Sequence, residues 1–266
     1  MADSIVNKKS VCIITGATKG LGKAITSNLA KELPKGSLFI LLARSQDLLD
    51  RISSQVKEND GIESVSMPFD QSCADGETNK KMLQDALAKA GVAVSQYEQA
   101  ILINNAGTLD HLDYSRNLDR LDVSTEYFKT NLSGCITLTA TFLQVFRAPD
   151  VKTRVVVNIS SLAAISPMKS WLLYCMAKAA REMMMKIVAA EEENTRTLNY
   201  APGPLVTEMT TTASDKTQDP ELRKWFTEQI EKKSLVECDD SAQKLIAILR
   251  KNTFENALHI DYYDEI

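Results

Sequence analysis

Features typical of metalloproteins, secreted proteins and membrane proteins are missing from this sequence. Its two histidines, His111 and His259, lie far apart and outside any H-E-x-x-H pattern, so no metal site is indicated. Its five cysteines form no C-x-x-C pair, which argues against a zinc cage or a disulfide framework, and we expect reduced thiols, mostly in the core. No apolar run approaches the ~20 residues that cross a bilayer, and the N-terminus lacks the apolar core of a signal peptide. We therefore expect a cytosolic protein without a membrane partner.

An excess of positive charge is also missing. The 31 Lys and Arg residues are outnumbered by 35 Asp and Glu residues, giving a net charge of -4. No basic stripe offers a footprint for nucleic acid, so we expect no nucleic-acid partner. The composition, 44% hydrophobic and 25% charged, is typical of a globular chain with a large core.

Short apolar runs alternate with amphipathic helical stretches along the chain. The run 10–16 is typical of a buried strand, and apolar residues then recur every fourth position from Leu21 to Leu33, where Pro34 stops the helix. Further strands are expected at 37–44, 101–107 and 154–161, and further helices at 48–56, 127–143 and 172–193. This alternation predicts an α/β protein with a parallel sheet, and the absence of linkers and repeats predicts a single domain, 1–266.

One segment breaks this rhythm. Residues 205–229 are polar, rich in threonine and long for a connection. Because connections of this length are usually functional lids or disordered segments, we expect a lid over a substrate. An ordinary surface excursion with a short helix is the alternative.

The stretch TGATKGLG, residues 15–22, is the first candidate for a binding site. It follows a strand and opens a helix, and its three glycines allow a sharp turn next to unpaired N–H groups that suit a phosphate. A P-loop is excluded, because Ala17 stands where its first glycine belongs and Ala24 stands where its hydroxyl belongs. The motif alone leaves open a glycine turn that binds nothing.

Two cations near this turn bear on the choice of cofactor. Sites for NAD place an acidic residue near the end of the second strand, whereas an arginine there accommodates the 2′-phosphate of NADP. Here the strand ends Ala43-Arg44, and Lys19 lies in the glycine turn. Each cation alone is typical of a solvated surface, but together they predict NADPH.

Tyr174 and Lys178 lie four residues apart in YCMAK and would share one helix face. A neighbouring ammonium favours the ionised phenol, so we expect Lys178 to lower the pKa of Tyr174 and make it an acid-base group. The spacing alone is more typical of packing. Ser161, thirteen residues upstream at a strand end, adds a hydroxyl placed to hydrogen-bond a carbonyl undergoing reduction.

Six motifs follow one another across most of the chain. They are TGATKGLG, NNAG at 104–107, TNLSG around Asn131, NISS ending at Ser161, YCMAK, and PGP at 202–204. In this order they resemble the short-chain dehydrogenase/reductase family. The resemblance implies a Rossmann-like, doubly wound parallel sheet with helices on both faces and hydride transfer from a nicotinamide. It also implies an oligomer, often a homodimer through the helices that carry Asn131 and Tyr174.

The same resemblance implies a role for each site residue. Ser161 would hold the substrate oxygen, Tyr174 would donate the proton, Lys178 would hold the nicotinamide ribose and tune Tyr174, and Asn131 would support a water-linked proton relay. The residues expected to bind the cofactor are Gly16, Ala17, Thr18, Lys19, Gly20, Leu21, Gly22, Ala43, Arg44, Asp70, Gln71, Asn105, Lys178, Leu205, Val206, Thr207, Glu208, Met209 and Thr210.

Longer stretches, among them WLLYCMAKAAREM, LNYAPGPLVTEM and the tail HIDYYDEI, resemble the members of this family that reduce pterins. This implies a small-molecule pterin substrate, anchored by Asp261 and lined by Gly203, since one carboxylate can accept two neighbouring N–H groups of the pterin ring. A solvated tail aspartate is the alternative for Asp261. For the whole chain, the alternatives are a reductase of other small ketones or diketones, and an NADPH-binding sensor without catalysis.

Overall fold

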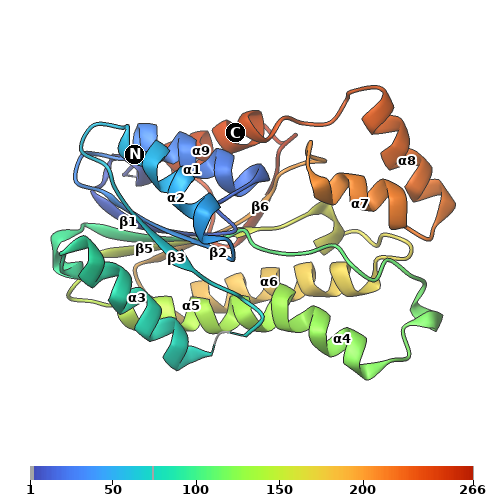
Figure 1. Ribbon diagram of the computed structural model, residues 1–266, viewed down its shortest axis with the longest axis horizontal. Coiled ribbons are helices and arrows are strands. Elements are labelled where there is room, and N and C mark those ends of the chain that lie inside the picture. The colour runs from blue at the N-terminus through green and yellow to red at the C-terminus, as the bar shows by residue number, and fades with distance from the viewer. Residues whose placement is uncertain (1–2, 74, 266) are drawn as a thin grey trace.

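The protein folds around one parallel β-sheet in the computed structural model, which describes residues 3–73 and 75–265 (Figure 1). The strands are β1 (Ser10–Thr15), β2 (Leu38–Ala43), β3 (Glu63–Pro68), β4 (Gln99–Asn104), β5 (Thr153–Ile159), β6 (Thr195–Ala201) and β7 (Leu258–Asp261). They lie in the order β3-β2-β1-β4-β5-β6-β7, and every neighbouring pair is parallel. The expected doubly wound α/β fold is confirmed.

Helices cover both faces of this sheet, as Figure 1 shows. The helices α1 (Gly20–Glu32), α2 (Gln46–Lys57) and α9 (Cys238–Lys251) pack on one face, and α3 (Gly76–Ala90), α5 (Gly134–Val145) and α6 (Leu172–Glu191) pack on the other. Because both faces are covered, β1 and β4 are buried along their whole length, which explains their apolar sequences. Within the part of the chain that is described, none of the helices has both the length and the apolar character needed to span a membrane.

The strand order reverses between β1 and β4. From β1 the chain runs outward through β2 to β3, and α3 then returns it to β4 on the other side of β1. Connections leave in opposite directions at such a point and open a crevice outside the carboxyl ends of the strands, where α/β proteins bind their ligands. The topology therefore predicts a ligand-binding site at the carboxyl ends of β1 and β4.

The helix expected at 127–143 is longer and is interrupted. The helix α4 (Leu121–Phe128) runs into a π-helical turn, Lys129–Ser133, and then into α5. Asn131 Nδ2 donates to the carbonyl of Tyr127 at 3.3 Å, the oxygen that the backbone amide of Asn131 would bond in a regular α-helix. This competition accounts for the wider turn, a feature frequent at functional sites.

Residues 205–229 are helical rather than an irregular loop. They contain α7 (Glu208–Lys216) and most of α8 (Pro220–Glu231). Asp219 caps α8 by accepting the amide of Leu222 at 3.0 Å. Phe226 of α8 packs with Trp171 at the start of α6. The threonine-rich segment is therefore an ordered cover beside α6, and its role as a substrate lid stays a prediction.

The cysteines lie mostly in the core or against it. All five are free; Cys12 and Cys135 are buried, Cys175 and Cys238 are half-buried, and Cys73 is exposed. Cys175 and Cys238 pack against core clusters, so only Cys73 departs from the expectation. In residues 3–73 and 75–265, no three side chains of His, Cys, Asp or Glu gather in a way that could hold a metal ion.

Candidate active site

The residues selected from the sequence gather at one edge of the sheet. Gly16 follows β1, Arg44 follows β2, Asp70 follows β3, Asn105 follows β4, Ser161 follows β5, Gly203 follows β6, and Asp261 ends β7. All strands of a parallel sheet end at the same edge, so these residues lie along the edge that contains the crevice between β1 and β4. Tyr174 and Lys178 join them from the first turns of α6.

The glycine turn needs its glycines for two different reasons. Gly16 and Gly20 have φ angles of 66° and 52°, a left-handed conformation that residues with a Cβ atom rarely adopt. At Gly22, a Cβ atom would lie 2.2 Å from the carbonyl oxygen of Gly16. The first turn of α1 therefore packs directly on the backbone of the loop, and a side chain at this position would push the two apart.

The N-terminus of α1 has no side-chain cap. Its N-cap residue, Lys19, makes no capping hydrogen bond, as is also the case for α4, α5, α6, α7 and α9, whereas α2, α3 and α8 are capped. The first N–H groups of a helix have no partner within the helix, and the helix dipole favours an anion beside them. An uncapped N-terminus beside the crevice suits a phosphate, so the residues present fit a dinucleotide.

Asn105 connects the glycine turn to the end of β4 through hydrogen bonds. Its Nδ2 donates to the carbonyls of Thr15 at 2.9 Å and of Gly16 at 3.3 Å. In return, Thr15 Oγ1 accepts the backbone amides of Asn105 at 3.0 Å and Ala106 at 2.9 Å. The structure therefore gives Asn105 a part in shaping the cofactor loop, and its direct contact with a cofactor stays a prediction.

Arg44 lies beside the glycine turn. It is exposed, and it comes two residues after Leu42, whose carbonyl accepts the amides of Gly16 at 2.7 Å and Ala17 at 3.3 Å. These bonds place the end of β2 against the turn that carries Lys19. The two cations on which the NADPH prediction rests therefore lie in the same part of the crevice.

The two residues predicted to lie along the adenine ring have different environments. Asp70 is exposed, and hydrogen bonds from Ser72 hold the pKa of its carboxyl below the usual value, with the Arg44 charge acting in the same direction. Gln71 is buried, and its Nε2 donates to the carbonyl of Thr130 at 2.6 Å. Gln71 thus braces the π-helical turn, and an adenine contact by either residue stays a prediction.

The segment Leu205–Thr210 reaches the glycine turn. Glu208, at the start of α7, forms an ion pair with Lys19. A Cβ atom on Gly20 would lie 3.3 Å from the Cγ2 atom of Thr207. The segment therefore lies against the start of α1, where the sequence predicts that it covers the cofactor.

Ser161, Tyr174 and Lys178 lie together in the structure. Tyr174 and Lys178 are each 8% exposed, and Lys178 Nζ is 5.5 Å from the centre of the Tyr174 ring. Lys178 Nζ donates to the carbonyl of Ile159 at 2.7 Å. Ser161 is close enough to the Tyr174 hydroxyl to act on its pKa, and the Ser161 Oγ accepts the amide of Ala163 at 3.2 Å. The predicted acid, its hydroxyl partner and the neighbouring amine are therefore in one place.

The pKa of Tyr174 departs from the expectation drawn from its sequence. Burial raises this pKa above its usual value, while the Ser161 hydroxyl and the charge of Arg181 act to lower it. Lys178 is itself buried, and burial together with Arg181 lowers its pKa well below the usual value, so it is a poorer cation than expected. Lys178 is not among the groups that shift the pKa of Tyr174, so its tuning role stays a prediction, and the sequence reasoning missed Arg181. A cation three residues after Lys178, on the same buried helix face, was the available signal.

Asn131 is buried, and both hydrogens of its side-chain amide are engaged. Its Nδ2 donates to Thr108 Oγ1 at 3.0 Å and to the carbonyl of Tyr127 at 3.3 Å, and its Oδ1 accepts the amide of Thr108 at 2.8 Å. A Cβ atom on Gly107 would lie 3.0 Å from this Oδ1, so the turn after β4 packs directly on Asn131. Since both amide hydrogens are engaged, Asn131 could take part in a proton relay only by accepting hydrogen bonds through its oxygen atoms. The relay itself stays a prediction.

Trp171 connects Tyr174 to α8. Its ring meets the Tyr174 ring edge to face, with centroids 5.4 Å apart, and stacks on Phe226 at 5.3 Å with an angle of 11°. Its Nε1 donates to Thr217 Oγ1 at 3.0 Å. The ring is buried between these partners, which favours packing over a role as a wall for the substrate.

Gly203 and Asp261 lie close together at the ends of β6 and β7. Asp261 pairs with Ala201, and a Cβ atom on Gly203 would lie 3.5 Å from the Cβ of Tyr262. Asp261 is half-buried, and its Oδ1 accepts the amide of Tyr263 at 3.1 Å. Among the residues that the structure describes, none donates a hydrogen bond to its Oδ2. One carboxylate oxygen is therefore available to a ligand.

A buried ion pair ties β7 to α6. His259 Nδ1 lies 2.6 Å from Oε1 of Glu182, which also accepts a hydrogen bond from Ser160. The bond with Glu182 raises the pKa of His259 above its usual value. The strand that carries Asp261 and the helix that carries Tyr174 are thereby held together.

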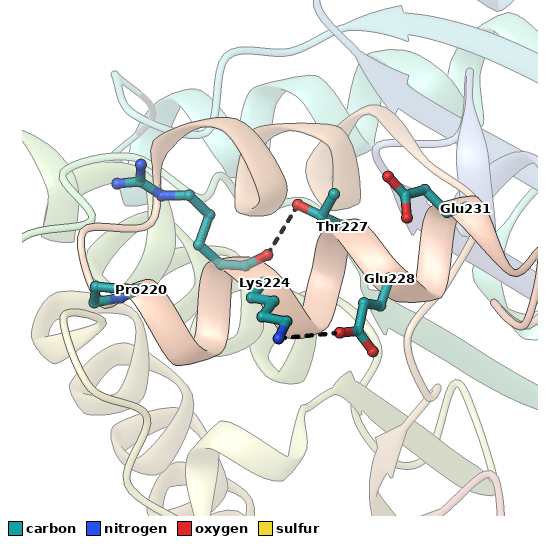
Figure 2. A pocket seen from close by; sticks show the side chains of 6 residues that line it. Pro220, Lys224, Thr227, Glu228 and Glu231 are labelled. Atoms are coloured by element: carbon teal, nitrogen blue, oxygen red, sulfur yellow. Dashed lines mark hydrogen bonds and ion pairs between the residues drawn. The ribbon is translucent and has the colours of Figure 1, made fainter.

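Figure 2 shows a shallow hollow on α8 that is separate from this site. The hollow is lined by Pro220, Arg223, Lys224, Thr227, Glu228 and Glu231. Lys224 and Glu228 form an ion pair at 3.8 Å within it. All these residues belong to one helix and none is a predicted site residue, so the hollow is a feature of the exposed surface.

The fold and the site have counterparts in known proteins. A family model described as short chain dehydrogenase matches residues 10–218. The chain belongs to the short-chain dehydrogenase family. This short-chain dehydrogenase is therefore an oxidoreductase that uses a nicotinamide cofactor.

Relatives of this dehydrogenase match it over nearly its whole length. Sepiapterin reductase from Bos taurus is 39% identical over 261 residues, which cover 97% of this chain and 96% of that protein. Sepiapterin reductase from Xenopus laevis is 36% identical over 258 residues, which cover 96% and 95%. The crystal structure of KRED1-Pglu enzyme has a TM-score of 0.80 and 24% identity, covering 94% of this chain and all of that one, and is similar in fold.

Proposed function

We propose that this dehydrogenase reduces the side-chain ketones of a pterin with NADPH, acting on sepiapterin or 6-pyruvoyl-tetrahydropterin in tetrahydrobiopterin biosynthesis. Its similarity to sepiapterin reductases over nearly the whole chain supports this substrate class. The observation that carries the proposal is the half-buried carboxylate of Asp261, with one oxygen available, at the sheet edge that also carries Ser161. A carboxylate there matches the planar N–H donors of a pterin ring, whereas a simple ketone offers no such group.

The same proposal names NADPH as the cofactor. The uncapped N-terminus of α1 suits its pyrophosphate, and Lys19 and Arg44 supply positive charge for the 2′-phosphate. In this family a carboxylate near the end of β2 would instead favour NADH, and Arg44 occupies that place. When bound, the nicotinamide supplies the hydride that the substrate carbon accepts.

The chain's own residues handle the substrate oxygen and its proton. Ser161 donates a hydrogen bond to the carbonyl oxygen, and Tyr174 passes its proton to that oxygen as the carbon gains the hydride, so an alcohol and a tyrosinate form. The raised pKa of Tyr174 keeps the proton on the phenol until that moment. Lys178, held by the carbonyl of Ile159, would then return a proton to the tyrosinate, and Asn131 would support the water-linked relay that resupplies it.

We also propose a cytosolic homodimer of single-domain subunits, with 205–229 as the substrate lid. Exposed apolar side chains on the outer faces of α5 and α6 support the assembly: Ile136, Met176, Met183 and Ile187 are each 44 to 54% exposed. On α6, three of them fall on one face, at intervals of seven and four residues. The free cysteines suit a reducing compartment.

A substrate panel with NADPH tests this function directly. Purified protein should oxidise NADPH in the presence of sepiapterin with a kcat/KM at least about tenfold above that for simple diketones, because only the pterin offers donors to Asp261. Absorbance of NADPH and of sepiapterin should fall together. Activity on diketones without activity on sepiapterin would indicate a general carbonyl reductase, and activity on none would indicate a cofactor-binding sensor.

Replacing Asp261 tests how the pterin is held. Asp261→Asn keeps the shape but loses the charge that accepts two N–H groups, so kcat/KM for sepiapterin should fall about 10- to 100-fold. Reduction of a small diketone should change little, as should both activities in the matched variant Glu265→Gln, which removes an exposed charge from the same tail. Equal losses for sepiapterin and the diketone in Asp261→Asn would indicate a structural role.

A further inference from the structure

Arg181 on α6 is a buried cation that pairs with no carboxylate among the described residues, since the buried carboxylate of the next residue, Glu182, is bound to Ser160 and His259. Only 1% of its surface is exposed. Its Nε donates to Asn158 Oδ1 at 2.8 Å, and its two terminal nitrogens donate to the carbonyls of Ala106 at 3.3 Å and Asn104 at 2.5 Å. These three acceptors are neutral oxygens, and no carboxylate in residues 3–73 and 75–265 forms an ion pair with it. Burying an unpaired charge is costly, so this arrangement calls for a reason beyond packing.

The guanidinium lies between the predicted catalytic residues and the turn after β4. Arg181 follows Lys178 by three residues and Tyr174 by seven, so all three side chains lie on one face of α6. Its Nη1 is 4.0 Å from the position of a Cβ atom on Gly107, and the same position is 3.0 Å from Oδ1 of Asn131. Arg181 therefore adjoins both the Tyr174–Lys178 pair and the turn that packs on Asn131.

Arg181 also sets the direction of a buried chain of amides. An arginine can only donate, so Asn158 presents its oxygen to it and turns its Nδ2 to Asn199 Oδ1 at 2.8 Å. Asn199 Nδ2 then donates to the carbonyl of Ala257 at 3.0 Å. This chain crosses β5 and β6 to the start of β7, the strands that lead to Ser161, Gly203 and Asp261.

We propose that Arg181 is a positioning residue for carbonyl reduction, which holds the turn after β4 against α6 and places a permanent positive charge behind Tyr174 and Lys178. This inference rests on the assignment of Tyr174 as the proton donor. The fixed charge stabilises the tyrosinate left after proton transfer.

The electrostatics of the site agree with this role. Burial is the main influence on both groups, raising the pKa of Tyr174 and lowering that of Lys178, and the charge of Arg181 acts to lower both. The other ionisable groups that bear on Tyr174 are Cys175, on the same helix, and Tyr127 on α4.

In the described part of the chain, no carboxylate is among the groups that shift the pKa of this tyrosine. Asp110 acts on Tyr127, and Glu182 is bound to Ser160 and His259. Reduction needs the protonated phenol, so activity falls as pH rises through the pKa of Tyr174. Removing the charge of Arg181 should raise that pKa and move the fall to higher pH.

The test is the pH profile of kcat/KM for reduction in two neutral variants and one charged variant. In Arg181→Met and Arg181→Gln, the decrease of kcat/KM at alkaline pH should shift to higher pH by about one unit, and kcat should drop at least tenfold. This decrease is called the alkaline fall below. In Arg181→Lys, which keeps the charge, the fall should stay at its native position. NADPH binding, measured by quenching of protein fluorescence, should persist in all three.

Arg154 provides the matched control, because it is also an almost buried arginine but lies at the opposite edge of the sheet. It is 9% exposed and paired with Glu192 at 3.0 Å. Arg154→Met should lower the melting temperature without moving the alkaline fall. An unmoved fall in both neutral Arg181 variants, the same movement in Arg154→Met, or failure of both neutral variants to fold would overturn the inference. Full turnover in Tyr174→Phe would instead overturn the proposed mechanism, so the two failures are distinguishable.

Discussion

Tyr174→Phe should retain NADPH binding and lose about 10²- to 10⁴-fold in kcat, the usual contribution of a positioned general acid. The substitution removes only the hydroxyl, which is close to Ser161 and carries the proton that the substrate oxygen needs. The ring contact with Trp171 at 5.4 Å does not depend on the hydroxyl, so the local packing should persist. Initial rates with saturating sepiapterin, together with a fluorescence titration with NADPH, measure the two effects separately.

Tyr97→Phe is the control for this experiment. Tyr97 is also buried, 5% exposed, and its pKa is also raised by burial, but it lies before β4, at the amino edge of the sheet. Its loss should leave kcat within about twofold of the native value. Turnover by Tyr174→Phe at the native rate would refute the proton-donor assignment.

Arg44→Asp should reverse the choice of cofactor. The native guanidinium would pair with the 2′-phosphate, an interaction of about 1.5–3 kcal/mol, so its loss together with the new repulsion should weaken NADPH at least about 100-fold. The new carboxylate can accept hydrogen bonds from the ribose of NADH, so the Kd for NADH should be unchanged or lower. Separate titrations with the two cofactors give the ratio.

Lys57→Asp is the control that shows whether the effect of Arg44→Asp depends on where the charge is changed. Lys57 is exposed in the last turn of α2, and its replacement makes a similar change of charge far from the glycine turn. It should leave the ratio of the two dissociation constants unaltered. An unchanged ratio in Arg44→Asp would show that Arg44 does not contact the phosphate, and Lys19 would then remain as the candidate cation.

The central sheet could be predicted because its signal is local. Strands covered on both faces are apolar over their central residues, as β1 and β4 are between their polar end residues, and a glycine turn followed by a four-residue apolar period marks α1. In contrast, β7 is four residues long and only Ile260 in it is buried, so it has no period to detect and depends on pairing with β6. The helix α8 had readable signals, an aspartate cap followed by a proline, which the polar composition of 205–229 obscured.

The gathering of the candidate residues could also be predicted from the sequence, because the residues that follow parallel strands lie at one edge of the sheet. The directions of the pKa shifts of Tyr174 and Lys178 could not be predicted from the sequence. Spacing placed Lys178 beside Tyr174 correctly, but the direction of a pKa shift depends on how much water each group has lost, and both are buried by elements distant in sequence. The π-helical turn at Asn131 was likewise hidden, since it arises from a side chain that competes with its own backbone.

The stack of Trp171 on Phe226 gives this protein a built-in optical reporter. The chain has only two tryptophans, and the second, Trp225, meets the same Phe226 at 4.8 Å, so all indole emission comes from the junction between Tyr174 and α8. Trp171 is 5% exposed and Trp225 is 43% exposed, so the two should emit at different wavelengths. A movement of α8 away from α6 would expose Trp171 and shift the spectrum to the red, which makes the opening of this cover visible in the unlabelled protein.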